Sequence, residues 1–190
     1  MASTVKAVVF SPAPYHIITY GTLLGTTFFH TFINGTVMFR TADRQNFSAI
    51  QQRLFPYYFG MQVALPGILA LTFPGNSLIG LSNGPAGLVS EFARWHSLLP
   101  IGIMALTGVI NLAVFLPMTV KIMKQRRGQV KRDGKEWYAE GPHSDEMKVL
   151  NKKFGIIHGV SSLLNLSTFF AAVAYGFTLG GRIMSVADLA

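Results

Sequence analysis

The sequence predicts an all-α polytopic membrane protein, a four-helix transmembrane bundle with a short interfacial helix after the first span. Half of its 190 residues are hydrophobic and 13% are charged, whereas a soluble domain carries about a quarter charged residues. Charged residues are absent from four long windows, at positions 7–39, 54–90, 95–120 and 154–181. Because a bilayer-crossing helix needs about 20 apolar residues, each window can hold one span of a single membrane domain, 1–190.

The first span is expected at about 15–39, just before Arg40. Its 25 residues extend roughly 37 Å as a helix, which is enough for a tilted crossing. The basic loop 40–53 follows. Its apolar residues recur at helical spacing between polar and basic ones, which predicts a short helix lying on the membrane surface.

The second span is expected at about 55–73. It begins near Pro56, which suits a first helical turn and is followed by two tyrosines that suit the headgroup boundary. Pro66 predicts a kink. Two turn signals, Pro74-Gly75-Asn76 and Ser82-Asn83-Gly84-Pro85, indicate that 74–90 is a re-entrant or interfacial connection rather than continued helix.

The third and fourth spans are expected at about 95–120 and 154–181. The third helix is predicted to continue past the membrane and to stop at Gly128. The fourth is predicted to begin near Asp145 and Glu146, since acidic residues favour a first helical turn. Between these spans lies the second basic loop, 121–153.

The distribution of Lys and Arg predicts the orientation. Loops 40–53 and 121–153 share a side of a four-span protein and hold thirteen basic residues, against three in the termini and the remaining loop. Loops rich in Lys and Arg stay in the cytosol during insertion. We therefore expect both loops to be cytosolic and both termini to face the other compartment.

Polar residues recur along two spans. Thr22, Thr26, His30 and Asn34 follow each other every four residues, and a second set occupies 158–165. They predict either hydrogen bonds that hold the helices together or a polar cavity for a small solute or lipid headgroup. The candidate intramembrane polar site consists of His30, Asn34, Asn111, His158, Ser162 and Asn165.

Two further patterns concern packing and lipid. Gly21 and Gly25 let another backbone approach closely, and we favour a helix of the same chain over a dimer. The basic run after the third span is a candidate for contact with anionic lipid heads, although membrane topology alone also explains it. Its candidate residues are Lys121, Lys124, Arg126 and Arg127.

Several function classes lack the residues they need. A metal-binding bundle requires carboxylates beside histidines, and no Asp or Glu lies within an expected span. We find no phosphate-binding glycine loop and no flanked nucleophilic serine. We therefore predict no enzyme, no cofactor and no nucleic-acid partner; the partners expected are membrane lipids, with a membrane-protein partner or a homo-oligomer possible.

Three stretches resemble the transmembrane protein 205-like family of eukaryotes, small multi-span proteins that share a domain of unknown function. They are Phe39-Arg40 with Phe47 and 52–59, then Asn111 through Pro117 with the basic helix beyond, and Phe154 with 158–166. The resemblance implies a four-helix membrane architecture and transfers no activity. It singles out Arg40, Arg53, Pro56, His158, Ser162 and Asn165.

Two roles remain open at this point. The leading hypothesis is a non-enzymatic organiser or accessory protein of an intracellular membrane, with the endoplasmic reticulum or another secretory membrane favoured and the mitochondrial outer membrane as the alternative. The other is a small-solute or lipid transporter that uses a polar stripe between spans one and four. A third, a membrane enzyme, would require His30 and His158 to approach each other beside a cavity.

Overall fold

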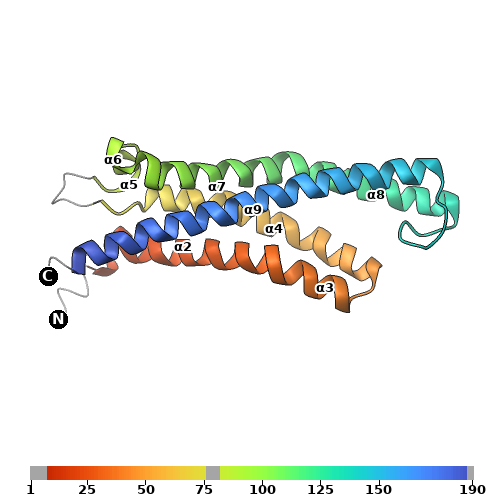
Figure 1. Cartoon of the computed structure of the whole chain (residues 1–190), viewed down its shortest axis with the longest axis horizontal. Coiled ribbons are helices and arrows are strands. Elements are labelled where there is room, and N and C mark those ends of the chain that lie inside the picture. Colours follow the sequence, from red (N-terminus) through yellow and green to blue (C-terminus); the bar gives the residue numbers. More distant parts are fainter. Residues whose placement is uncertain (1–7, 76–81, 188–190) are drawn as a thin grey trace.

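The computed structural model describes residues 8–75 and 82–187, and within these ranges the regular elements are helices, with no strand. Four long helical stretches run along the molecule in alternating directions (Figure 1). The beginning of α2 and the end of α9 lie at one end of the bundle, and the two connections that hold most basic residues lie at the other. The predicted all-α class is confirmed.

The first stretch comprises α2 (Pro12–Phe28), the π-helical segment η1 (Phe29–Asn34) and α3 (Gly35–Thr41). Proline suits the first turn because its missing N–H would have no intrahelical partner there. After a tight turn, α4 (Arg44–Leu71) begins at a cap in which Asp43 Oδ1 accepts the backbone N–H of Asn46, at 2.8 Å.

The residues expected to form a separate interfacial helix, 44–53, are instead the first turns of α4. Pro56 therefore lies inside α4 rather than in its first turn, and Pro66 also lies inside it. The physical reason is the Asp43 cap, which starts the helix well before the apolar window. Of the expected connection 74–90, positions 76–81 lie outside the described residues, and the rest contains α5 (Gly84–Leu88). Helix α6 (Glu91–Ala93) follows directly after this connection.

The third stretch joins η3 (Arg94–Leu98), α7 (Leu99–Ile110), η4 (Asn111–Phe115) and α8 (Leu116–Asp133). The two π-helical segments directly precede Pro100 and Pro117. A proline ring clashes with the carbonyl four residues earlier, and a locally wider turn relieves that clash.

The expected stop at Gly128 is wrong, because α8 continues for more than a turn beyond it. The helix ends before Gly134, whose φ of 62° is left-handed. A residue in this conformation lets its N–H bond back to the last turn, here to Val130 at 2.9 Å, and glycine adopts it without a Cβ penalty.

The fourth stretch is α9 (Asp145–Ala187), which begins at the position that the acidic pair predicts. Helix α7 packs against both α4 and α9, and α2 packs against the same two helices. At the closest approach of α4 and α7, a Cβ added to Gly108 would lie 2.6 Å from the carbonyl oxygen of Gln62. The core between the four stretches includes Leu23, Leu69, Phe73, Met104, Ala172 and Tyr175.

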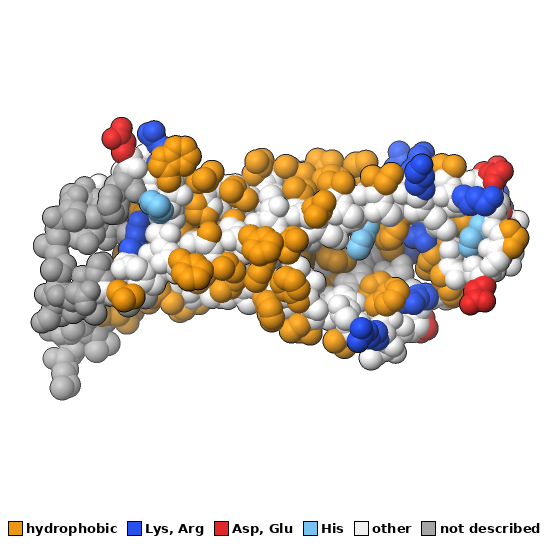
Figure 2. All heavy atoms as spheres, in the orientation of Figure 1, with side chains coloured by type: hydrophobic (Ala, Val, Ile, Leu, Met, Phe, Trp, Pro, Cys, Tyr) orange, Lys and Arg blue, Asp and Glu red, His pale blue; other side chains and the backbone are white. Residues whose placement is uncertain are grey.

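Within the described residues, three helices are long and apolar enough to cross a membrane: Arg44–Leu71, Arg94–Asp133 and Asp145–Arg182. Hydrophobic side chains cover the middle of the face seen in Figure 2, and charged ones gather toward its ends. Large exposed apolar side chains include Leu106, Leu163, Phe170 and Phe177. Such a surface is consistent with an integral membrane protein.

The expectation for Gly21 and Gly25 is wrong. A Cβ added at either position would meet no described atom within 4 Å, and both glycines are exposed. Neither glycine therefore marks a close approach of another helix within the described chain. Spacing identifies a face that permits close approach, but it does not identify a helix that uses it.

Candidate functional site

Asn111 is the centre of a polar network between the third and fourth stretches. Its side chain is fully buried at the start of η4. Its Nδ2 donates to Asn165 Oδ1 at 3.0 Å, and its Oδ1 accepts the hydroxyl of Ser161 at 2.8 Å. One turn earlier, the buried hydroxyls of Thr107 and Thr168 lie 2.7 Å apart. These bonds link α7 and η4 to α9 at two successive levels.

A second network links the first stretch to α4. Asn34 Nδ2 lies 3.3 Å from His30 Nδ1 and donates to Gln51 Oε1, also at 3.3 Å. The His30 ring lies against Tyr58, with 4.3 Å between ring centroids. Both His30 and Asn34 belong to η1, so the π-helical turn carries the polar residues that face α4.

The structure does not bring the candidate residues of spans one and four into one site. His158 and Ser162 are exposed on α9, where His158 stacks on Phe154 and Ser162 donates to the His158 carbonyl. Where η1 approaches α9, the ring of Phe32 meets that of Phe169, with 5.1 Å between centroids. His30 contacts α4, and Asn165 bonds to η4. The two polar stripes therefore link different pairs of helices, η1 with α4 and η4 with α9.

A buried polar cluster that sequence reasoning missed lies near the opposite end of the bundle. His16 is fully buried; its Nε2 lies 2.6 Å from the Tyr175 hydroxyl and its Nδ1 lies 3.1 Å from the Thr72 hydroxyl. Tyr20 donates to the Ala172 carbonyl at 3.1 Å. His16 falls at the start of the expected span 15–39 and is not among the candidate site residues. Helical spacing offered a signal, because His16 and Tyr20 are four residues apart and so share a face of α2.

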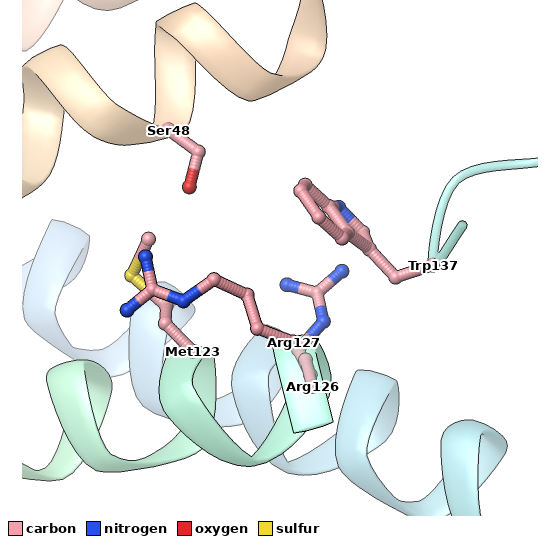
Figure 3. A pocket seen from close by; sticks show the side chains of 5 residues that line it. All are labelled: Ser48, Met123, Arg126, Arg127 and Trp137. Carbon is pink, nitrogen blue, oxygen red and sulfur yellow. The ribbon is translucent and has the colours of Figure 1, made fainter. Parts of the chain in front are cut away.

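The candidate lipid contacts divide into two kinds. Lys121 and Lys124 are exposed on α8. Arg126 and Arg127 line a small pocket together with Ser48, Met123 and Trp137 (Figure 3). The residues that the family resemblance singled out in the first half of the chain, Arg40, Arg53 and Pro56, are exposed.

The chemistry available to these sites is hydrogen bonding and charge. Within 8–75 and 82–187, no group of three or more His, Asp or Glu side chains is placed to hold a metal ion. His30 and His158 make their ring contacts with Tyr58 and Phe154, on different elements. The arrangement therefore supplies links between helices and one cluster of cationic side chains at the basic end.

Comparison with known proteins identifies the family of this chain. Residues 18–128, from α2 into α8, match the family model described as "Domain of unknown function (DUF4149)". The chain is also similar to "Xanthocillin biosynthesis cluster protein D" of Aspergillus fumigatus, at 30% identity over 172 residues that cover 90% of this chain and 91% of the relative. No solved structure matches the chain significantly. The family model covers more than half of the sequence, and the chain therefore belongs to the DUF4149 family.

Proposed function

We propose that this chain is a non-enzymatic accessory or organising protein of an intracellular membrane, built from four membrane-crossing helices. Three helices have the required length and apolarity. The first stretch, Pro12–Thr41, would supply the fourth, because thirty helical residues extend about 45 Å. The resemblance to transmembrane protein 205-like proteins supports the same architecture.

The observation that carries the proposal is the pairing of buried polar side chains across helices. Asn111 bonds to both Ser161 and Asn165, and His16 bonds to both Thr72 and Tyr175. Polar groups used in this way hold a bundle together. They are not available to coordinate a passing solute, which favours a structural role over a transport pathway.

The relative's name supports an accessory role. That protein is named for a biosynthesis cluster and not for a catalysed reaction. A chain with a compact bundle and an exposed apolar surface fits such a role, with membrane lipids and a membrane-protein partner as the expected contacts. A secretory membrane such as the endoplasmic reticulum is the favoured location.

One observation favours the alternative, a small-solute or lipid-handling protein. The buried side-chain oxygen of Gln62, Oε1, has no hydrogen-bond partner among the described residues. A buried acceptor without a partner is unfavourable, so water or a polar solute could occupy this part of the interface between the first stretch and α4.

Flux measurements separate the two roles. Purified protein in phosphatidylcholine vesicles is assayed for uptake of small solutes and for lipid transfer between vesicles, beside protein-free vesicles. The accessory role predicts no flux above the protein-free control, together with crosslinking into a larger assembly in native membranes. The accessory role would be overturned in favour of solute handling if the protein gave flux and Gln62→Leu abolished that flux without lowering the unfolding temperature.

A further inference from the structure

The basic end of the bundle carries a strong excess of positive charge. Segments 40–53 and 121–153 together contain thirteen Lys and Arg residues and six Asp and Glu residues. Lys and Arg side chains gather at this end of the molecule, toward the right of Figure 2. A concentration of one sign of charge attracts anions, and it does so most strongly where the groups are fixed and partly shielded from water.

A pocket at this end brings two arginines together with a hydroxyl group. It lies between the first turns of α4, the middle of α8 and the connection that follows α8, and it is lined by Ser48, Met123, Arg126, Arg127 and Trp137 (Figure 3). Its volume is about 10 Å³, which is room for one group the size of a water molecule. A single phosphate oxygen could enter, with the rest of the phosphate at the mouth.

Arg126 is held in place by two aromatic rings. Its guanidinium carbon lies 4.6 Å from the centroid of Phe154 and 5.2 Å from that of Trp137. Such contacts orient a guanidinium without neutralising its charge. Its Nε is buried and meets no hydrogen-bond acceptor in the part of the chain that the structure describes.

Arg127 reaches from α8 toward α4. Its Nη1 donates to Gln52 Oε1 at 3.2 Å, and Gln52 lies one turn after Ser48 on α4. In the described part of the chain, no carboxylate oxygen lies within 4.0 Å of a side-chain nitrogen of either arginine. The ion pair among the described residues joins Lys148 to Asp145 and involves neither arginine. The positive charges of the pocket are therefore not neutralised by ion pairs.

We infer that this pocket binds a phosphate monoester, carried either by an anionic lipid headgroup or by a small soluble phosphate compound. Arginine suits phosphate because its planar fork of N–H donors matches two phosphate oxygens, and the Ser48 hydroxyl adds a donor. The pocket arginines follow Val120 by six and seven residues, or about 10 Å along a helix. That distance is at the level of lipid headgroups.

Glu136 brings a negative charge to the same end of the bundle as the pocket. It precedes Trp137 in the chain, and its Oε1 accepts Gln45 Nε2 at 3.0 Å, which places its carboxylate at the same end of the bundle. A negative charge there opposes an incoming anion. Glu136→Gln should therefore strengthen phosphate binding.

Trp137 allows binding to be followed directly. The chain has two tryptophans, Trp95 and Trp137, so Trp95→Phe leaves the fluorescence of the pocket residue alone. The full-length Trp95→Phe protein, in phosphatidylcholine nanodiscs at about 0.15 M salt, is titrated with dioctanoyl phosphatidic acid and separately with inorganic phosphate. We expect a saturable change in Trp137 emission with at least one of them.

Three variants test the site in this background. Arg127→Gln should weaken binding about tenfold, because it removes charge-assisted hydrogen bonds, and Arg127→Lys should weaken it less. The matched control Lys131→Gln removes the same charge from an exposed position of α8 outside the pocket and should change affinity less than twofold. Ser48 is not a core residue, so Ser48→Ala gives a second pocket variant if Arg127→Gln fails to fold.

The outcomes are distinct. An Arg127-dependent response to phosphatidic acid alone supports a lipid headgroup, and an equal response to inorganic phosphate supports a soluble phosphate compound. No response to either ligand, or equal losses in Arg127→Gln and Lys131→Gln, would overturn the inference. The site does not depend on the accessory role, since either could be present without the other.

Discussion

The hydroxyl of Tyr175 lies 2.6 Å from Nε2 of His16, a residue 159 positions earlier in the chain. This bond joins α9 to α2, and a second bond, from the same imidazole to Thr72, brings in the segment that follows α4. Both rings are fully buried. One side chain of the first helix therefore links three of the four long stretches.

Tyr175→Phe should lower the stability of the bundle. The change keeps the ring but leaves a buried imidazole nitrogen without its partner, which costs about 1–2 kcal/mol in the free energy of unfolding. Unfolding in mixed detergent micelles measures the loss. Tyr15→Phe is the control, because Tyr15 is exposed on the same helix as His16; equal effects of the two changes would contradict the importance of the His16 contact.

Asn111→Leu should destabilise the pairing of η4 with α9. It leaves the Asn165 amide and the Ser161 hydroxyl without their cross-helix partner, and the expected loss is roughly 1–2 kcal/mol. Ser162→Ala should change the free energy of unfolding by less than about 0.5 kcal/mol, because that hydroxyl is exposed and bonds within its own helix. A larger loss for Ser162→Ala than for Asn111→Leu would refute this assignment.

Gly108→Ala should disrupt the contact of α7 with α4. The added methyl group would lie 2.6 Å from the Gln62 carbonyl oxygen, so the helices must separate; overpacking of this kind costs about 1–3 kcal/mol. Gly102→Ala, in the same helix, meets no atom within 4 Å and should be neutral or stabilise by up to about 1 kcal/mol. Thermal unfolding of the two variants in the same detergent measures both effects. A Gly108→Ala protein more stable than the unchanged chain would contradict the close contact of α7 with α4.

The cap of α4 should respond to acid. Hydrogen bonds from the backbone N–H and then the side chain of Asn46 lower the pKa of Asp43 below its ordinary value of 3.8. A lowered pKa in the folded state means that the cap stabilises at pH values above 3.8 and loses this effect as the pH falls through the folded pKa.

Hydrogen exchange at the Asn46 amide measures this response. Protection of the amide, corrected for the intrinsic exchange rate, should stay constant from pH 7 to about 5. It should decrease once the pH is below the ordinary pKa of Asp43. Asp43→Asn preserves a good capping side chain but cannot titrate, so its protection should not depend on pH over this range. Acid-induced loss in that variant too would show that another group controls the first turn of α4.

The sequence predicted the long helices because charge-free windows and helical spacing are local properties. It also predicted that polar residues share faces, and the structure pairs Asn111 with Asn165. Spacing cannot show which helix a face meets. The alternative transporter hypothesis placed the stripe of His30 and Asn34 opposite span four, but its hydrogen bond to another helix and its ring contact are made with α4.

Other differences also arise from tertiary context. The end of α8 depended on which of two glycines, Gly128 or Gly134, adopts the left-handed conformation, and only the second does. The contacts of His16 could not be predicted, because its partner Tyr175 lies near the other end of the chain. The pocket at the basic end likewise combines Ser48 with Arg126 and Trp137 from distant segments, and no local pattern reveals that juxtaposition.

The bond between His16 and Tyr175 has a consequence for biogenesis. The ribosome synthesises α2 first and α9 last. His16 therefore cannot bond to Tyr175 until almost the whole chain has been translated. Thr72 emerges much earlier and can engage the other ring nitrogen in the meantime. A nascent chain truncated before Tyr175 would therefore leave one ring nitrogen of His16 without its partner, so the link between α2 and α9 forms only when the chain is nearly complete.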